Sequence, residues 1–153
     1  MFGGGGNLVC PRVDTLVGAE RITQFLPGPG RDLTDIEFEG TIAKVRTDCD
    51  YDRNGFVEVS ATIDMVFSRG PASRGDSGRF EYFVAISGPG DEIIDKQNFV
   101  LDVPFTDGAM RVAAREEITQ EFSHDPDADA RRYRIFIGFQ LTREQLDYQR
   151  ARR

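Results

Sequence analysis

The feature that most constrains this chain is a two-residue alternation of apolar and polar side chains in its middle third. The apolar members of the alternation are Val57, Val59, Ala61, Ile63, Met65 and Phe67. Successive side chains of a β-strand point to opposite faces of its sheet, so this pattern is typical of a strand with one buried and one solvated face. The sequence therefore predicts a long, half-buried strand here.

Similar alternations elsewhere in the chain predict further strands. They cover residues 21–25, 36–42, 80–86, 99–105, 112–122 and 133–139. Clusters rich in Gly, Pro, Asn and Asp separate these segments and predict turns. Pro104 cannot donate a hydrogen bond to a neighbouring strand, so its segment is expected at a sheet edge or ends there. About seven short strands with one buried face each predict an all-β fold, an antiparallel immunoglobulin-like β-sandwich.

The end of the chain has a different pattern, which predicts a short helix over residues 142–153. Thr142 is followed three residues later by Gln145, the spacing of a capping box, and the last residues are mostly arginine, which suits the C-terminal end of a helix. Leu146 and Tyr148 give this helix only a narrow apolar contact. We therefore expect the helix either to lie on the sandwich or to face a partner.

The length and composition predict one globular domain. The chain has 153 residues, 39% of them hydrophobic, which is enough for a single buried core. We expect a flexible Gly-rich tether over residues 1–9, the β-sandwich over residues 10–141 and the helix after it. Leu8 and Val9, at the end of the tether, are candidate contacts for a partner protein, together with the apolar residues of the helix.

The turn before the central strand contains acidic residues spaced like the start of a calcium loop. An EF-hand needs a bidentate carboxylate at its twelfth position and a helix on each side. Ala61 occupies that position here, and the flanking segments are strand-like. Asn-Gly between two apolar alternations is typical of a hairpin turn, so a turn is favoured. A weaker calcium site stays open as the alternative, formed with oxygens of a neighbouring loop by Asp48, Asp50, Asp52 and Asn54.

Several other polar strings are interpreted as structural. The loop from His124 to Asp129 holds the single histidine of the chain and three aspartates, and it is typical of a solvated turn. The string GDSG around Ser77 is similar to four residues of the trypsin-like nucleophile segment, but no base lies near it in sequence. The overlapping string RGDS, residues 74–77, resembles an integrin-binding sequence. Glu116 falls on an inward face and Asp64 on either face, and neither is predicted to be catalytic.

The two cysteines, Cys10 and Cys49, lie on either side of the turn sequence PGPG. A hairpin folded at this turn would bring both to the same end of a strand pair. A disulfide between them would stabilise the fold by roughly 4 kcal/mol on the chain-entropy model. The alternative is two unrelated buried thiols. A disulfide would place the protein in an oxidising compartment, the periplasm or the cell exterior.

Charge and hydropathy narrow the partner classes. The net charge of −7 disfavours nucleic acids and anionic surfaces as the main partners. No apolar run approaches the roughly 18 residues of a transmembrane helix, so no membrane span is expected. The opening MFGGGG contains no signal peptide, which taken literally indicates the cytoplasm. A Gly-rich opening is also typical of a flexible tether ahead of an exported domain.

Four segments together resemble alphaproteobacterial predicted lipoproteins of unknown function. They are NLVCPRV, RITQFLPGPGRDLTDIEFEG, DCDYD and IGFQLTREQLDYQR. In such proteins an export signal and a lipid-modified cysteine precede a short Gly/Ser-rich tether. The resemblance implies a periplasmic location, a tether remnant over residues 1–7, and a disulfide role for Cys10 in place of lipidation. The sequence departs from that pattern at its start, where no export segment or lipobox precedes the glycines.

These observations lead to a functional hypothesis. We expect a non-enzymatic, periplasmic or outer-membrane-associated domain that acts as a structural or accessory subunit for a protein partner, with a lipid anchor and no cofactor. The alternative is a calcium- or carbohydrate-binding module that uses the loops at 50–54 and 124–129.

Overall fold

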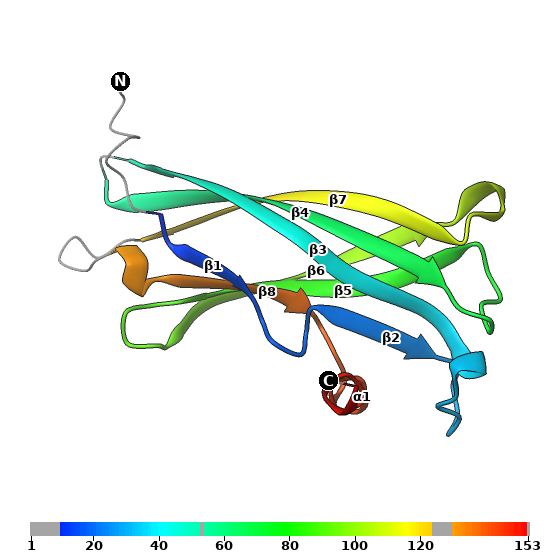
Figure 1. Ribbon diagram of the computed structural model, residues 1–153. Helices are drawn as coiled ribbons and strands as arrows, with labels where there is room; N and C mark the ends of the chain where they lie inside the picture. The colour runs from blue at the N-terminus through cyan, green and yellow to red at the C-terminus, as the bar shows by residue number, and fades with distance from the viewer. Residues whose placement is uncertain (1–9, 53, 124–129, 153) are drawn as a thin grey trace.

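The computed structural model describes residues 10–52, 54–123 and 130–152, whose strands pack as two layers (Figure 1). The strands of the described residues are β1 (Arg12–Thr15), β2 (Arg21–Phe25), β3 (Ile36–Tyr51), β4 (Phe56–Arg69), β5 (Ser77–Ser87), β6 (Ile93–Pro104), β7 (Arg111–Ser123) and β8 (Arg134–Phe139). Short 3-10 turns occupy Leu33–Asp35, Thr106–Gly108 and Ala130–Arg132, and one α-helix, α1 (Arg143–Ala151), ends the chain. The predicted all-β fold with a short C-terminal helix is confirmed.

Each layer is a four-stranded sheet. The first sheet has the strand order β1-β8-β5-β6, and the second has the order β2-β3-β4-β7. All neighbours run antiparallel except β1 and β8, which run parallel. Strand β1 was not predicted from the sequence, because a strand of four residues with one inward apolar side chain, Val13, gives almost no periodic signal. Pro104 behaves as expected, since it ends β6 and β6 is an edge strand.

The predicted inward face of the central strand is the centre of the core. All six apolar residues of that alternation are buried in β4, and Ile63 has no exposed surface. Aromatic rings from both sheets meet there, with the Phe67 and Phe80 centroids 4.4 Å apart. Gly40 permits this packing, because a Cβ at that position would lie 2.7 Å from the Phe67 ring. The two-residue period therefore specifies the shared core directly.

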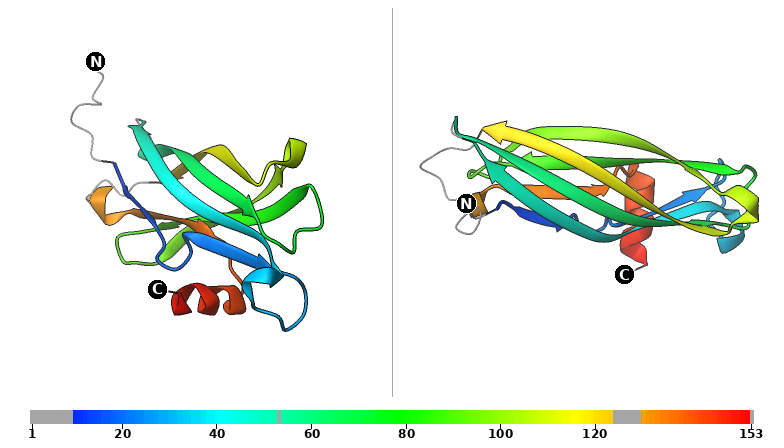
Figure 2. Two further views of the ribbon diagram at one scale, coloured as in Figure 1. Left: turned by 45° about the vertical axis from the view of Figure 1, so that its right-hand side comes forward. Right: turned by 90° about the horizontal axis from the view of Figure 1, so that it is seen from above.

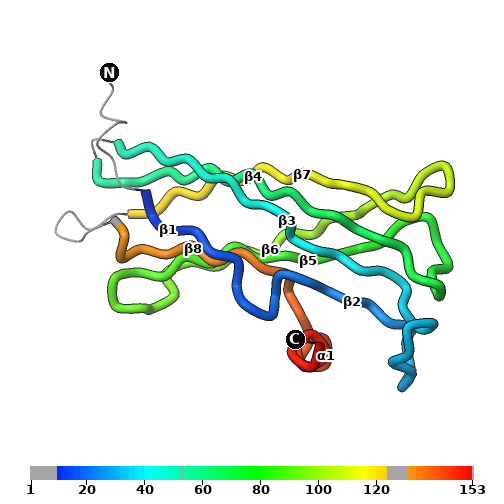
Figure 3. The backbone as a smooth tube through the Cα atoms, in the orientation of Figure 1, coloured from blue at the N-terminus to red at the C-terminus, as the bar shows by residue number. Residues whose placement is uncertain are grey.

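The disulfide joins the two sheets. Cys10 precedes β1 in the first sheet and pairs with Cys49 on β3 in the second, with the Cα atoms 5.8 Å apart. The predicted hairpin at residues 27–30 is present, since β2 and β3 pair around it. The predicted route to the disulfide was wrong, however, because Cys10 precedes β1 in the first sheet, and the chain enters the second sheet only at β2. Figure 3 shows the chain running from β1 through a loop into β2.

Helix α1 lies beside β2, across the direction of the strands (Figure 2). The predicted capping box is present. The Thr142 hydroxyl accepts from the Gln145 backbone N–H at 3.1 Å, and the Gln145 side chain accepts from the Thr142 N–H at 2.9 Å. Among the described residues, no helix is long and apolar enough to cross a membrane.

The two lateral sides of the sandwich differ. On the side that we call the closed side, the β1–β2 connection and the disulfide link the sheets. On the side that we call the open side, β6 and β7 end their sheets, and inward residues such as Phe99 and Ile118 stay half-buried. A side-chain hydrogen bond from Gln120 on β7 to Gln97 on β6, at 2.9 Å, joins the two edge strands there.

Candidate binding surfaces around the C-terminal helix

A polar network fixes α1 on β2. The buried Gln149 donates from Nε2 to the Thr23 hydroxyl at 2.9 Å, and that hydroxyl donates to Glu39 Oε2 at 3.1 Å. Arg152 donates to the same carboxylate at 3.3 Å. Buried polar groups are costly unless they are bonded, so this network sets the rotation of α1. The rotation decides which helix residues face outward and which face the sheet.

Two predicted partner contacts of the helix touch the protein itself. The Tyr148 and Phe25 rings meet edge to face, with centroids 5.0 Å apart. Leu146 packs over Gly18, where an added Cβ would lie 3.3 Å from Leu146 Cδ1. Both helix side chains remain half-buried, so contact with a partner stays a prediction. The other two predicted contacts, Leu8 and Val9, lie outside the described residues.

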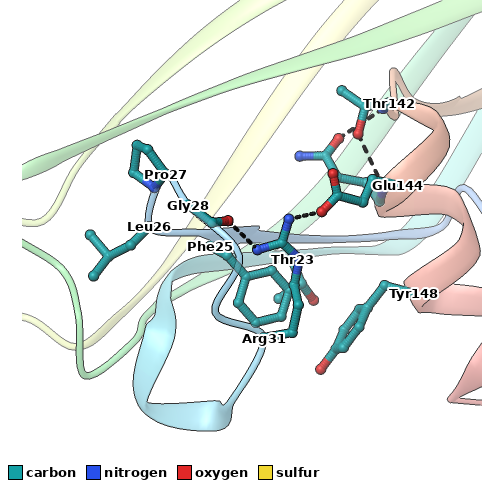
Figure 4. Close-up of a pocket in the computed structure, with 10 residues that line it drawn as sticks. Thr23, Phe25, Leu26, Pro27, Gly28, Arg31, Thr142, Glu144 and Tyr148 are labelled. Carbon is teal, nitrogen blue, oxygen red and sulfur yellow. Dashed lines mark hydrogen bonds and ion pairs between the residues drawn. The ribbon is translucent and has the colours of Figure 1, made fainter.

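On one side of α1 lies a pocket of about 290 Å³, which we call the helix pocket (Figure 4). It is lined by Thr23, Phe25, Leu26, Pro27, Gly28, Arg31, Thr142, Glu144, Gln145 and Tyr148. Arg31 crosses it and forms an ion pair with Glu144. The same guanidinium donates to the Gly28 carbonyl at 2.9 Å and lies 5.2 Å from the centre of the Phe25 ring. Since its charged groups are bonded to one another, the pocket joins a loop to the helix and leaves few free donors for a ligand.

On the other side of α1 lies a pocket of about 340 Å³, which we call the apolar hollow. It is lined by Leu16, Val17, Ala19, Phe83, Lys96, Phe139, Gln140, Leu141, Leu146 and Arg150. Leu16 and Val17, in the β1–β2 loop, are 43% and 67% exposed. Exposed apolar side chains that adjoin a concave apolar surface are typical of interaction sites. The apolar hollow is therefore the stronger candidate of the two pockets.

The rim of the apolar hollow is positive. Lys96 donates to Gln140 at 3.0 Å and lies 4.9 Å from the centre of the Phe83 ring. Within the described part of the chain, Arg150 makes no ion pair, and none of the described lining residues is acidic. In a chain with a net charge of −7, this local excess of positive charge suits a ligand with an apolar group and a carboxylate.

The residues of the predicted calcium site lie at the β3–β4 hairpin, which is confirmed. Asp52 Oδ1 accepts from the backbone N–H groups of Asn54 at 2.8 Å and Phe56 at 3.0 Å, so it closes the turn. Asp48 accepts from the next backbone N–H, and Asp50 lies opposite Glu58. Across the described residues, no group of three or more His, Cys, Asp or Glu side chains is placed to hold a metal ion. Calcium binding stays a prediction.

The remaining polar candidates fall in different places. Ser77 begins β5 and is exposed, and the other three residues of the RGDS string lie in the β4–β5 loop. Asp64 points to the outer face, where Arg115 Nε lies 2.7 Å from it and holds the pKa of the carboxyl below its usual range. Glu116 points inward as predicted, and its Oε1 accepts from the Tyr82 hydroxyl at 2.9 Å. The loop from His124 to Asp129 lies outside the described residues.

No family model matches this chain, and no curated protein matches it.

The apolar hollow was not predicted from the sequence, although Leu146 was among the predicted partner contacts. The hollow takes residues from the β1–β2 loop, from β5, from β6 and from the segment that runs from the end of β8 into α1, and no periodic pattern relates these four segments. The only local signal was the apolar pair Leu16–Val17 in a segment without strand alternation.

Proposed function

We propose that this chain is a non-enzymatic, exported β-sandwich domain that docks on a protein partner as an accessory or structural subunit. The observation that carries the proposal is the apolar hollow, in which the exposed Leu16 and Val17 adjoin Leu146 of the helix. Burying such side chains against a partner releases about 25 cal/mol for each Å² of apolar surface, which favours association. The sandwich supplies a rigid body that holds the hollow in shape.

The partner segment that suits this hollow carries a bulky apolar side chain with a carboxylate close to it. The volume of about 340 Å³ is enough for one or two large side chains. Lys96 and Arg150 on the rim are placed to pair with the carboxylate, and a paired charge at the edge of an apolar contact selects the partner more than it strengthens binding. The proposed partner is therefore a protein segment of this composition.

The sandwich is proposed to have an immunoglobulin-like architecture. Its proposed location is the periplasm or the outer membrane. The disulfide between Cys10 and Cys49 is compatible with export, because disulfides persist in oxidising compartments. The resemblance to alphaproteobacterial lipoproteins supports a lipid anchor ahead of the Gly-rich tether. Such an anchor would hold the sandwich at a membrane surface, where an accessory subunit meets its assembly.

The experiment that tests this function is site-specific photo-crosslinking in cells that produce the protein. A photoreactive residue at Val17 is expected to give one discrete adduct with a partner, and Arg150→Glu is expected to remove it. A photoreactive residue at Leu33, which is 73% exposed outside the hollow, is the matched control and is expected to give none. Equal adducts from both positions, or an adduct at Val17 that Arg150→Glu leaves unchanged, would contradict the proposed docking surface.

The alternative function is calcium or carbohydrate binding. Its supporting observation is a pocket of about 250 Å³ at the β3–β4 hairpin, lined by Asp50, Asp52, Glu58 and Glu121 among others. Calcium prefers such carboxylate oxygens. Melting curves with calcium and with a chelator separate the two functions, because a ligand of the folded state raises the melting temperature. An increase of several degrees would favour the binding module, and no change would favour the accessory subunit.

A further inference from the structure

The outer edge of β7 is long and free. This strand of 13 residues pairs with β4 along one side, and no described strand pairs with its other side. Free backbone N–H and C=O groups along such an edge are a template for another strand. Proteins commonly interrupt such edges with proline, bulges or charged side chains. β7 contains neither proline nor glycine, its inward Glu116 is bonded to Tyr82, and its outward charges are of both signs. The edge is therefore competent to pair with another strand.

The outward side chains of β7 carry a charge pattern that is complementary to itself. Counting from Glu116 at the centre, Arg115 and Glu117 lie one residue away on opposite sides, and Arg111 and Glu121 lie five residues away. When a strand pairs antiparallel with its own copy around Glu116, residues at equal distances from the centre come opposite each other. Both arginines would then face glutamates.

Within the described residues, the two ends of β7 carry unpaired charges of opposite sign, so each end could pair with the other end of a second copy. At one end Asp50, Glu58 and Glu121 lie directly opposite one another on three neighbouring strands. Like charges in this arrangement destabilise a sheet, and none of the three makes an ion pair with a described residue. At the other end Arg111 is exposed and likewise makes no ion pair within the described part of the chain.

We propose that two copies of this chain pair antiparallel along β7, with the two-fold axis at Glu116. The second sheets of the two copies then form one continuous sheet. Arg111 of each copy then lies opposite Glu121 of the other copy, so a positive charge stands beside the row formed by Asp50, Glu58 and Glu121. Arg115, which already holds Asp64 at 2.7 Å, gains Glu117 of the second copy, so positive and negative charges alternate across the junction.

The register follows from the same charges. Moving the axis by one residue in either direction places Arg115 opposite its own copy, or Glu117 opposite its own copy. In both cases neither Arg111 nor Arg115 faces a glutamate. The proposed axis also places the two Glu116 side chains opposite each other. They point inward, each accepts from the Tyr82 hydroxyl of its own sandwich, and four arginine–glutamate pairs on the outer face accompany this one like-charged pair. The pairing leaves the apolar hollow free, because the hollow lies on the first sheet.

Charge reversal tests this dimer by sedimentation velocity over a range of protein concentrations at physiological salt. The unaltered chain is expected to dimerise, and Arg111→Glu or Glu121→Arg alone is expected to weaken the dimer by roughly tenfold, since each places two like-charged pairs across the axis. The double variant carrying both reversals is expected to regain the original dissociation constant. Ser68→Glu, which adds one negative charge on β4 directly opposite Arg111 of the same chain, is expected to strengthen or preserve the dimer.

A second measurement fixes the register. Ala113 and Thr119 are exposed on the outer face and come opposite each other across the proposed axis. The paired substitution Ala113→Cys and Thr119→Cys is expected to give covalent dimers on mild oxidation, whereas either cysteine alone is expected to give few. A chain that stays monomeric at about 200 µM, a dimer that ignores the β7 reversals, or a double reversal that fails to restore pairing would each overturn the proposal.

Discussion

The closed side and the open side of this sandwich solve the same problem in different ways. Each side must deal with the last strands of two sheets. On the closed side the disulfide joins the two sheets, and a buried hydrogen bond from Gln149 to Thr23 holds α1 against β2. On the open side, no described strand pairs with the outer edges of β6 and β7. The outward charges of β7 are positive toward one end and negative toward the other. The fold therefore completes one side internally and leaves the other competent to bind.

Both sides of the sandwich share one hydrophobic core, and Ile63→Asp is expected to disrupt this core. Ile63 has no exposed surface and lies at the centre of β4, so the substitution buries a charge without a partner. We expect a loss of more than about 4 kcal/mol, enough to unfold the domain, measured by circular dichroism and urea denaturation. The neighbouring Thr62→Asp, on the outer face, is the control and should fold. A folded Ile63→Asp chain would show that the inward face is assigned wrongly.

Removing the disulfide would test whether it closes the closed side. Replacing both Cys10 and Cys49 with Ser is expected to cost roughly 4 kcal/mol of unfolding free energy, because the unfolded chain gains the freedom of a long loop. Urea denaturation measures this loss. Gln97→Ala, which breaks the hydrogen bond between the edges of the open side, is the comparison and is expected to cost about 1 kcal/mol. Equal losses would mean that the bridge adds nothing to closure.

Much of the fold could be predicted from local sequence, because its signals are periodic. Alternation located the longer strands, and the spacing of Thr142 and Gln145 located the helix start. These patterns act within one element, so one segment of sequence contains them. The cysteine pair was also predicted, although from a hairpin that the chain does not use for it. Cys10 approaches from the other sheet, and local pattern does not encode the crossing between sheets.

The candidate surfaces could not be predicted in the same way. The apolar hollow joins four segments distant in sequence, and its charges become significant only when Lys96 and Arg150 meet on one rim. The charge symmetry of β7 was present in the sequence, but its meaning depends on the edge position of the strand. Whether a charged strand face is merely solvated or can pair with a copy is a property of the sheet order.

The polar anchor of α1 gives a smaller and sharper test of the closed side. Thr23→Val removes the hydroxyl that accepts from Gln149 and donates to Glu39. Because Gln149 is buried, we expect a loss of about 1–3 kcal/mol in unfolding free energy. Thr119→Val, on the exposed face of β7, makes the same chemical change and is expected to stay within about 0.5 kcal/mol of the unaltered chain. A Thr23→Val chain as stable as the original would indicate that water replaces the anchor.

The open side contains its own interior polar pair, whose pH dependence shows how well that side excludes water. Burial raises the pKa of Tyr82 above its ordinary value, and the hydrogen bond and charge of Glu116 raise it further. The folded chain therefore keeps the phenol proton at pH values where the unfolded chain has lost it. Since the unfolded state then binds fewer protons, the unfolding free energy must fall as pH rises above about 10.

Tyr82→Phe removes this contribution, so its unfolding free energy should fall less steeply than that of the original chain between about pH 9.5 and 11. Glu116→Gln is the matched control, because it keeps a side chain of the same size and removes the negative charge beside the phenol. The unfolding free energy of Glu116→Gln should fall with pH less steeply than that of the original chain and more steeply than that of Tyr82→Phe. Equal slopes for all three would mean that Tyr82 ionises freely in the folded state, and that solvent reaches it between β6 and β7. The open side would then be a hydrated cleft, and only its outer edge would be structured for pairing.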